Sequence, residues 1–354
     1  MTVPVLEAKR FVLQAMVAVG TVRQHAQQLA DVLVTADYMG HYSHGLNRLE
    51  MYIADIETKT TDPNAHPAVL KESPATAWVD GNNGLGPVVG NFCMQLAIQK
   101  AKAAGVGWAV AKGSNHYGIA GWYTRTALEH GLLGMSFTNT SPLMGPTRAK
   151  EAALGTNPLS LAAPGKNGDS FVLDMATTAV AVGKIEVQRR KGEPITEGWA
   201  QDPEGRSTTD ADLAFKTGCL MPLGGSEITS GYKGYGLGLL VETLCGILGG
   251  SAFGPNIRRW MEHTDRPADL GQCFVAIDPQ CFAPGFNDRM STLMDYLRGL
   301  QPVDSSKPVL VPGDPERNHM KMVDQQGGIQ YHDNQLKASA ALAKRLGITP
   351  IEVK

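Results

Sequence analysis

The sequence predicts an α/β protein built on a mixed central sheet, with helical regions at both ends of the chain. Short apolar strands alternate with amphipathic helices between about residues 75 and 138, which is typical of βαβ units. Two more apolar strands, 159–163 and 171–175, lie close together in sequence and are expected to pair antiparallel. The sheet should therefore contain both strand directions. The first and last segments repeat their apolar residues with helical spacing.

Three helical segments are expected at the start of the chain. Pro4 suits the first position of a helix that runs to about residue 19. Thr21 is expected to cap a second helix, which stops near residue 40. A third amphipathic segment resumes around Leu46 and has Tyr52 among its apolar positions. The polar stretch between the second and third segments contains two histidines and a serine.

The remaining elements follow from apolar runs bounded by turn residues. Strands are expected at 76–80, 106–111, 133–138, 159–163, 171–175 and 273–277, and helices at 87–104, 119–130, 182–191, 233–248, 287–299 and 334–346. Residues 192–232 are rich in Gly, Pro and Asp and are expected to be irregular. Residues 308–314 are expected to be extended and to end in a turn.

Composition excludes several classes of protein. The 354 residues suggest two domains at about 150 residues per domain, and 43% hydrophobic residues supply a sizeable core. Lys plus Arg is 32 against 34 for Asp plus Glu, and no basic run is longer than 189–191, so binding to nucleic acid is not expected. The most apolar stretch, 237–250, contains Glu242 and is too short to span a membrane.

Cysteine usage and the N-terminus favour a cytoplasmic protein. The five cysteines are widely spaced and form no C-x-x-C, which fits neither a disulfide framework nor a zinc site. Residues 1–4 lead directly into an amphipathic segment, without the apolar stretch of a signal peptide.

The common nucleotide and hydrolase motifs are missing. The glycines of 81–86 have the spacing G-x-x-G-x-G, which is the reverse of the Rossmann pattern, and those of 234–238 are also off pattern. There is no Walker A loop, no H-E-x-x-H and no G-x-S-x-G. Glycine clusters of this kind more often serve turns or helix packing than chemistry.

The first candidate site is Ser43-His44-Gly45, followed by Arg48. A histidine exchanges protons near neutral pH, and Arg48 is expected one helical turn away on the same face. A guanidinium holds a carboxylate through two parallel hydrogen bonds. A helix-capping serine beside a surface histidine is the more common explanation of such a segment when it stands alone.

The second candidate site is His116 in Gly113-Ser114-Asn115-His116-Tyr117-Gly118, directly after an apolar strand. Ligand-binding loops gather where strands end in α/β sheets. Asp174 ends another strand, and two roles are open for it. Its carboxylate either orients a histidine or caps the next helix. Asn157 also lies beside a strand and is equally typical of a turn.

Taken together, these segments resemble the malate/L-lactate dehydrogenase family, which is distinct from the Rossmann lactate and malate dehydrogenases. Its members include ureidoglycolate, sulfolactate and 2,3-diketogulonate oxidoreductases and a cyclic-imine reductase. The resemblance covers nearly the whole chain in eight ordered motifs. These are Asp37 with Ser43-His44-Gly45-x-x-Arg48, the segment 113–118, Thr138-Asn139-Thr140-Ser141-Pro142, Gly155-Thr156-Asn157-Pro158, Asp174-Met175-Ala176-Thr177-Thr178, Gly198-Trp199-Ala200-x-Asp202, Lys233-Gly234-Tyr235-Gly236-Leu237 and Val311-Pro312-Gly313-Asp314.

The resemblance implies a set of site residues. His44, with Ser43 beside it, matches the acid/base residue and ranks slightly ahead of His116, the proton acceptor in some members. Asp174 matches an aspartate near the acid/base group and the cofactor. Arg48 matches the carboxylate clamp, and Thr156 and Asn157 are expected to contact substrate. The dinucleotide is expected to contact Thr140, Ser141, Asp174, Met175, Ala176, Lys233, Gly234, Gly313 and Asp314.

The resemblance also implies the activity and the organisation of the chain. We expect hydride transfer between NAD or NADP and C2 of a small 2-hydroxy or 2-oxo acid, with a histidine as acid/base. Residues 1–115 with 305–354 are expected to form a helical substrate and dimerisation region, and 116–304 a non-Rossmann nucleotide-binding domain. A homodimer is expected.

The residues are compatible to different degrees with three alternatives to this activity. Reduction of a cyclic imine on the same scaffold stays open, because the sequence does not separate it from the oxidation of hydroxy acids. A metal-dependent hydrolase needs further ligands at coordinating spacing, and none is evident, so no metal site is expected. A binding protein without activity would be expected to lose polar site residues that are all present here.

Overall fold

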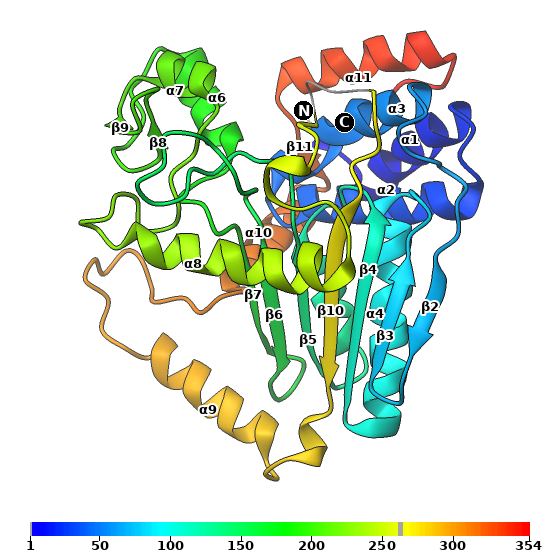
Figure 1. The fold of residues 1–354 in the computed structure, drawn as a ribbon, viewed down its shortest axis with the longest axis vertical. Helices are drawn as coiled ribbons and strands as arrows, with labels where there is room; N and C mark the ends of the chain where they lie inside the picture. The colour runs from blue at the N-terminus through cyan, green and yellow to red at the C-terminus, as the bar shows by residue number, and fades with distance from the viewer. Residues whose placement is uncertain (1, 261–264) are drawn as a thin grey trace.

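A seven-stranded sheet forms the centre of the molecule. The structure is a computed structural model and describes residues 2–260 and 265–354. Only β3 and β4 are parallel, and every other neighbouring pair is antiparallel, so the prediction of a mixed sheet is confirmed. The strands follow the order β2 (Ala68–Glu72), β3 (Thr76–Asp80), β4 (Val106–Ser114), β10 (Leu270–Ile277), β5 (Leu133–Thr138), β6 (Leu159–Pro164) and β7 (Ser170–Met175) (Figure 1).

The late strand β10 lies in the middle of this sheet, between β4 and β5. The predicted βαβ unit is present as β3, helix α4 (Gly86–Ala104) and β4. Helix α5 (Ala120–Leu128) then connects β4 to β5, which are separated by β10. Because β10 runs antiparallel to both neighbours, β4 and β5 point the same way.

Helices cover both faces of the sheet. Alternate residues of β10 face opposite sides, as expected for a pleated strand. Phe274 and Ala276 belong to a core shared with α4 and α5. Cys273 and Val275 belong to a second core with Val241 of α8 (Gly231–Glu242). In Figure 1, α8 crosses the near face of the sheet and α4 lies behind it.

The two ends of the chain meet in one helical region, as predicted. Its core joins residues of α1 (Val5–Ala18), α2 (Arg23–Tyr38), α3 (Leu49–Glu57), α10 (Asp314–Gln325) and α11 (Asp333–Leu346). Strand β1 (Thr2–Val3) pairs with β11 (Ile329–Gln330), and the backbones of Thr2 and Lys354 exchange two hydrogen bonds. Both termini therefore lie side by side (Figure 1).

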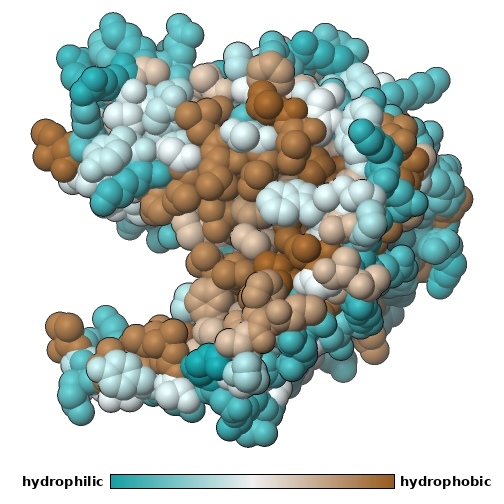
Figure 2. Space-filling model, turned by 60° about the horizontal axis from the view of Figure 1, so that its bottom comes forward, coloured by the Kyte–Doolittle hydropathy of each residue, from teal (hydrophilic) through white to brown (hydrophobic). Residues whose placement is uncertain are grey.

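A small lobe stands beside the helical region (Figure 1). It contains α6 (Val182–Lys191), α7 (Ala211–Thr217) and the two-residue strands β8 (Ala200–Gln201) and β9 (Ser207–Thr208), around a small apolar core. The helix α9 (Phe286–Arg298) lies at the opposite end of the molecule. Figure 2 shows a deep notch in one side of the molecule, with apolar side chains gathered on the face beside it.

Several local predictions were wrong. Thr21 does not cap α2: Val22 takes the N-cap position, and the buried Thr21 hydroxyl has no hydrogen-bond partner among the described residues. The helix expected over 233–248 changes to a π-helical turn at Thr243–Ile247, which inserts an extra residue into the helical repeat. Residues 192–232 include α7 and two short strands. The turn expected at the end of 308–314 is present, but helix α10, which starts directly after it at Asp314, was not predicted.

The division at residue 115 stays a prediction. The sheet contains strands from both proposed parts, because β2, β3 and β4 precede that residue and β5, β6, β7 and β10 follow it. Among the described residues, we find no helix with both the length and the apolar character needed to cross a bilayer.

Candidate active site

One edge of the sheet gathers most of the predicted polar residues. The carboxyl ends of β4, β5 and β7 meet the amino ends of β6 and β10 there, as their register shows. Residues just beyond these ends include His116 after β4, Thr140 after β5, Asn157 before β6 and Asp174 at the end of β7. Strand topology therefore brings four separate motifs to one edge.

The Ser43-His44 segment is a tight turn and not part of a regular helix. Two 3₁₀ turns, η1 (Tyr42–His44) and η2 (Leu46–Arg48), are joined by Gly45. A side chain at Gly45 would overlap the carboxylate of Asp37, which packs against it. Asp37 Oδ2 accepts hydrogen bonds from the Leu46 amide at 2.8 Å and the Tyr331 hydroxyl at 2.7 Å. The prediction that His44 and Arg48 share one helical turn is therefore wrong, since the helix is interrupted between them.

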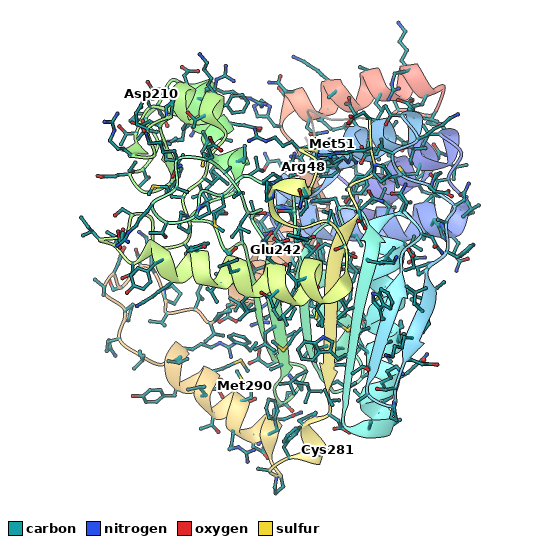
Figure 3. The ribbon with its side chains drawn as sticks, in the orientation of Figure 1. Arg48, Met51, Asp210, Glu242, Cys281 and Met290 are labelled. Atoms are coloured by element: carbon teal, nitrogen blue, oxygen red, sulfur yellow. The ribbon has the colours of Figure 1, made fainter. Side chains whose placement is uncertain are left out.

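Arg48 folds back on the same turn. Its Nε donates to the carbonyl of Ser43 at 2.6 Å, and its Nη1 lies 3.4 Å from the sulfur of Met51. Figure 3 shows Arg48 and Met51 next to each other, above the sheet. Burial lowers the pKa of Arg48, and Glu186 of α6 partly offsets this effect. The residue stays charged, since a guanidinium keeps its proton at any physiological pH.

His44 lies between Ser43 and His116. Its Nδ1 is 2.8 Å from the Ser43 hydroxyl, and its ring is stacked with that of His116 at a centroid distance of 6.0 Å and an interplanar angle of 20°. Burial, together with the nearby Arg48 and His41, lowers the pKa of His44 to about 4. The imidazole is therefore neutral at neutral pH.

The Nδ1 atom of His116 has two partners. The Tyr52 hydroxyl lies 2.6 Å away, and the Gly118 amide donates to the same nitrogen at 3.3 Å. An amide N–H only donates, so this contact favours a resting imidazole that carries its proton on Nε2. A hydroxyl both donates and accepts, so Tyr52 can bond either tautomer. Burial lowers the pKa of His116 well below its ordinary value, and His44 and Arg48 add to the effect.

Asp174 contacts the start of α5 and not the two stacked histidines. Its Oδ2 accepts a hydrogen bond from the Gly121 amide at 2.6 Å. Burial raises its pKa to about 6, while Gly121 and the nearby His41 act in the opposite direction. Burial opposes protonation of His41, but Glu316, 3.4 Å away, and Asp174 outweigh it and raise the pKa of His41. Asp174 thus forms an acidic group with Glu316 around His41.

Asn157 is fully buried and engaged inside the fold. Its side-chain amide donates to Gly238 O at 3.0 Å and to Glu242 Oε2 at 2.8 Å, while its oxygen accepts from the Thr140 amide at 3.1 Å. Asn139 donates to the other carboxylate oxygen of Glu242 at 2.9 Å. These bonds supply the partners that a buried amide and carboxylate need. The substrate contact expected of Asn157 stays a prediction.

The remaining cofactor candidates lie in four groups. Thr140 and Thr156 face each other at the strand ends, with their hydroxyls 3.3 Å apart, next to Ser141. Met175 and Ala176 follow Asp174 and are half-buried. Lys233 is exposed in the first turn of α8, and Gly234 packs too closely on Leu223 to accept a side chain. Gly313 packs on Val172 of β7 with φ 101°, and Asp314 pairs with Arg298 and Arg317.

Sequence reasoning missed three side chains around His116. Tyr52 was expected only as part of an apolar helical face, whereas Asp55 and Trp260 belong to no predicted motif. Their roles arise from tertiary contacts: Trp260 stacks on His116 at 4.3 Å, and its indole N–H donates to Asp55 at 2.8 Å. Only the i, i+3 spacing of Tyr52 and Asp55 was visible in the sequence.

A sequence model of the family described as malate/L-lactate dehydrogenase matches residues 3–338. The chain belongs to the malate/L-lactate dehydrogenase family. The fold class and the family predicted from the eight motifs are confirmed.

Members of the malate/L-lactate dehydrogenase family with different names resemble this chain along almost its whole length. The malate dehydrogenase of Pyrococcus abyssi is 38% identical, over 99% of this chain and 96% of the relative. The L-sulfolactate dehydrogenase of Methanocaldococcus jannaschii is also 38% identical, over 96% of each chain.

Solved structures of family members show the same fold. The malate dehydrogenase of Pyrococcus horikoshii OT3 matches with a TM-score of 0.90 at 35% identity, over 99% of this chain and 97% of the other. A delta1-piperideine-2-carboxylate reductase from Pseudomonas syringae pvar. tomato matches with a TM-score of 0.85 at 28% identity, over 97% and 100% of the chains. The chain is therefore an oxidoreductase of a family whose named members act on small hydroxy acids and on a cyclic imine.

Proposed function

We propose that this protein oxidises a small 2-hydroxy acid to the 2-oxo acid, and catalyses the reverse reaction, with NAD or NADP. The proposal rests on one observation. The charged Arg48 lies near the stacked, neutral imidazoles of His44 and His116, at the edge where the sheet strands end. A guanidinium binds the carboxylate that every 2-hydroxy acid has, and an imidazole exchanges the proton of the neighbouring hydroxyl.

His116 is the proton-exchanging residue in this proposal. Oxidation needs the tautomer opposite to the resting one, in which Nδ1 carries the proton and donates it to the Tyr52 hydroxyl. Nε2 is then free to take the hydroxyl proton of the substrate. In the reduction direction the imidazolium returns the Nε2 proton to the oxo oxygen. Tyr52 suits both states because its hydroxyl either donates to Nδ1 or accepts from it. His44, whose ring is stacked with that of His116 and whose Nδ1 contacts the Ser43 hydroxyl, is the rival for this role.

Arg48 orients the acid for this exchange. Its Nε donates a hydrogen bond to the Ser43 carbonyl, and this bond fixes the direction of the guanidinium relative to His44. A carboxylate held by Arg48 places the C2 hydroxyl of the substrate next to the imidazoles. Orienting a substrate in this way supplies a large share of an enzyme's rate enhancement.

A nicotinamide dinucleotide fits the donors present. Hydroxyls of Thr140 and Thr156 at the strand ends suit the ribose, and α8 offers its amino end with the exposed Lys233 to phosphates. When bound, the nicotinamide supplies the hydride acceptor or donor. Relatives differ in their named cofactor, NADP for the sulfolactate enzyme of Chromohalobacter salexigens and NAD for the ureidoglycolate enzymes of Escherichia coli.

The basic end of α6 does not select between the two cofactors. Arg189 pairs with Asp212 at 2.7 Å and lies over the ring of Phe215, and Lys191 is 3.9 Å from Glu193. Arg189 therefore has its partners in α7 and Lys191 has its partner just after α6, which fits a solvated helix end better than a 2′-phosphate site.

Reduction of a cyclic imine is the second candidate, supported by the likeness to the piperideine-2-carboxylate reductase. Such a substrate carries the same carboxylate next to a C=N bond, so Arg48 would have the same task. Both candidates are tested by assaying 2-hydroxy acids, 2-oxo acids and cyclic imino acids with each cofactor. The change in nicotinamide absorbance measures turnover. Turnover of imines alone would replace our first proposal, and binding of neither cofactor would overturn both.

We also propose a cytoplasmic homodimer. All five cysteines are free, which suits a reducing compartment. Around α8 and the turns after it, large apolar side chains are exposed to solvent, among them Tyr232, Leu239, Leu240, Ile247, Leu248 and Phe253. A contiguous apolar face of this kind marks an interaction surface.

Changing Leu240 to Arg should shift the protein from dimer to monomer, because a charge at the centre of an apolar contact is left without a partner. Light scattering after size exclusion measures the mass. Phe282→Arg, at a more exposed apolar position beyond β10, is the control. A wild-type protein with the mass of a monomer would contradict the dimer.

A further inference from the structure

One face of the His116 imidazole is covered by Trp260. The two rings are stacked, with centroids 4.3 Å apart and 27° between their planes. Trp260 also meets Tyr52 edge to face at 5.5 Å. Trp260, Tyr52 and His44 thus surround the imidazole that exchanges the proton in our proposal.

Trp260 is fixed at its side chain and at its backbone. The indole N–H donates to Asp55 Oδ2 at 2.8 Å, and the buried guanidinium of Arg258 donates to the same oxygen at 2.6 Å. At the backbone, the Trp260 amide donates to the Ser141 hydroxyl at 3.1 Å, and that hydroxyl donates to the Arg258 carbonyl at 2.8 Å. The indole ring therefore has little freedom to turn away from His116.

Two residues of helix α3 hold the His116 imidazole in place, one directly and one through Trp260. Tyr52 and Asp55 are three residues apart and lie on the same side of the helix. Tyr52 contacts Nδ1 of the imidazole, and Asp55 holds the tryptophan that covers its face. A carboxylate buried with a guanidinium and an indole N–H keeps its charge satisfied, so this anchor is stable.

We propose that Trp260, anchored by Asp55, is a positioning residue that keeps the His116 imidazole oriented and shielded from water while it exchanges the substrate proton. The inference rests on the proposed function for its catalytic meaning, but the contact itself is independent of it. Trp260 touches His116 and not the reacting atoms, so it acts through that imidazole.

The electrostatic surroundings of His116 agree with this role. His44 and Arg48 act on it from η1 and η2, and Tyr52 contacts it from α3. Asp55 acts on Tyr52 and is bonded to Trp260 and Arg258. The largest effect on the pKa of His116 is burial, which disfavours the imidazolium, and the positive groups act in the same direction. Removing the indole admits water to the ring, and a hydrated imidazole is more easily protonated.

The test is a titration of His116 by nitrogen NMR in protein with ¹⁵N-labelled histidine, the signal being assigned by its loss in His116→Gln. We expect the pKa of His116 to rise by about one pH unit or more in Trp260→Leu, and by less in Trp260→Phe, which keeps an aromatic ring but loses the bond to Asp55. Trp78→Leu is the matched control, because its indole also donates a 2.8 Å bond, to Gly249, away from the site.

Kinetics give the second readout. In Trp260→Phe, kcat should fall by about tenfold with little change in KM, because the substrate still binds while the imidazole is less well placed. The pH profile of kcat/KM should move in the same direction as the NMR titration.

Unchanged pKa values of His116 in both Trp260 variants would overturn the proposal, and so would an equal shift in Trp78→Leu. Should Trp260→Leu not fold, Trp260→Phe alone decides by the same criterion. Because the titration needs no turnover, it stays valid if the protein oxidises no hydroxy acid. Failure of the proposed function and failure of this inference are therefore separate results.

Discussion

At the scale of single residues, His44 and His116 differ in what their Nδ1 atoms contact. That of His44 meets the hydroxyl of its neighbour Ser43, whereas that of His116 meets a buried tyrosine and a backbone amide. The second arrangement fixes the ring more firmly, since its partners belong to a helix and to the loop after β4. This difference is why the proposal ranks His116 ahead, although sequence resemblance favoured His44.

Replacing His116 by Gln should lower kcat by about 10²- to 10⁴-fold, the usual contribution of acid/base catalysis. The affinity for the nicotinamide cofactor, measured by fluorescence titration, should change little. His44→Gln is the comparison and should cost less. A larger loss in His44→Gln would reverse the assignment, and an equal loss of cofactor affinity in both would show that they shape the nucleotide site.

Changing Arg48 to Lys should raise KM for 2-hydroxy acids by about tenfold or more, with a smaller change in kcat. An ammonium keeps the charge but makes no two-pronged contact with a carboxylate. Steady-state kinetics with a 2-hydroxy acid and with the matching alcohol that lacks the carboxylate separate the two effects. An unchanged KM for the acid would argue against the clamp.

The chemical residue types of the site were predictable from sequence, and their partners were not. His44, Arg48 and His116 stand in short local motifs, so their chemistry can be read from neighbouring positions. Asp55 and Trp260 are about two hundred residues apart and meet only in the folded chain. Asn157 looked like a ligand because a polar residue beside a strand serves equally well as a ligand or as an internal hydrogen-bonding group.

At the scale of elements, the turn that carries His44 depends on α2 and on the segment before α11. Asp37, near the end of α2, accepts hydrogen bonds from Leu46 and from Tyr331. Burial raises the pKa of this carboxyl from 3.8 to about 7. The carboxyl is thus protonated more readily in the folded protein than in the unfolded chain. Its contribution to stability is complete below 3.8 and is lost as the pH rises through about 7.

Asp37→Asn should therefore remove a pH dependence of stability. Its amide oxygen still accepts from Leu46 and Tyr331, and it carries no charge at any pH. Relative to wild type, the variant should gain stability as the pH rises from about 5 to about 8. Urea unfolding midpoints at the two pH values measure this. The control is Asp31→Asn, because Asp31 lies on the same helix as Asp37 and pairs with Lys9 of α1. A difference independent of pH would contradict a raised pKa.

Elements with a strong local pattern were predicted nearly to the residue, such as β3, β5, α4 and α6. Those that failed lack such a pattern. Helix α10 starts directly at the Gly313-Asp314 turn, and the turn signal concealed the helix behind it. Helix α7 has only seven residues, which is too short for a clear apolar period.

At the scale of the whole molecule, an ion-pair network ties its two late helices to the sheet. Asp314 at the start of α10 pairs with Arg298 of α9 at 2.8 Å and with Arg317 at 2.6 Å, and Arg298 also pairs with Asp169 before β7. The bonds to Arg298 hold the pKa of Asp314 well below its ordinary value. The stabilising charge is therefore present above 3.8 and is lost as the pH falls, which is opposite to Asp37.

Asp314→Asn should lower the free energy of unfolding by about 2 kcal/mol at neutral pH, since it leaves Arg298 and Arg317 with a weaker acceptor. The deficit should shrink as the pH falls below 3.8, because this carboxyl takes up a proton in the unfolded wild-type chain while it is still ionised in the folded protein. Chemical denaturation across this range is the measurement. Asp288→Asn, in an exposed pair with Lys166, is the control. An equal deficit at every pH would show that packing, and not charge, is lost.

The place of β10 has a consequence for how this protein is made. As the polypeptide leaves the ribosome, β4 and β5 appear early, but the strand that joins them follows only after the whole small lobe and α8 have been synthesised. Until then the two edges that β10 will occupy present unpaired backbone groups, the kind of surface that promotes aggregation of nascent chains. The central sheet therefore cannot be completed until the last third of the chain has been translated. A chain arrested before β10 is expected to need a chaperone.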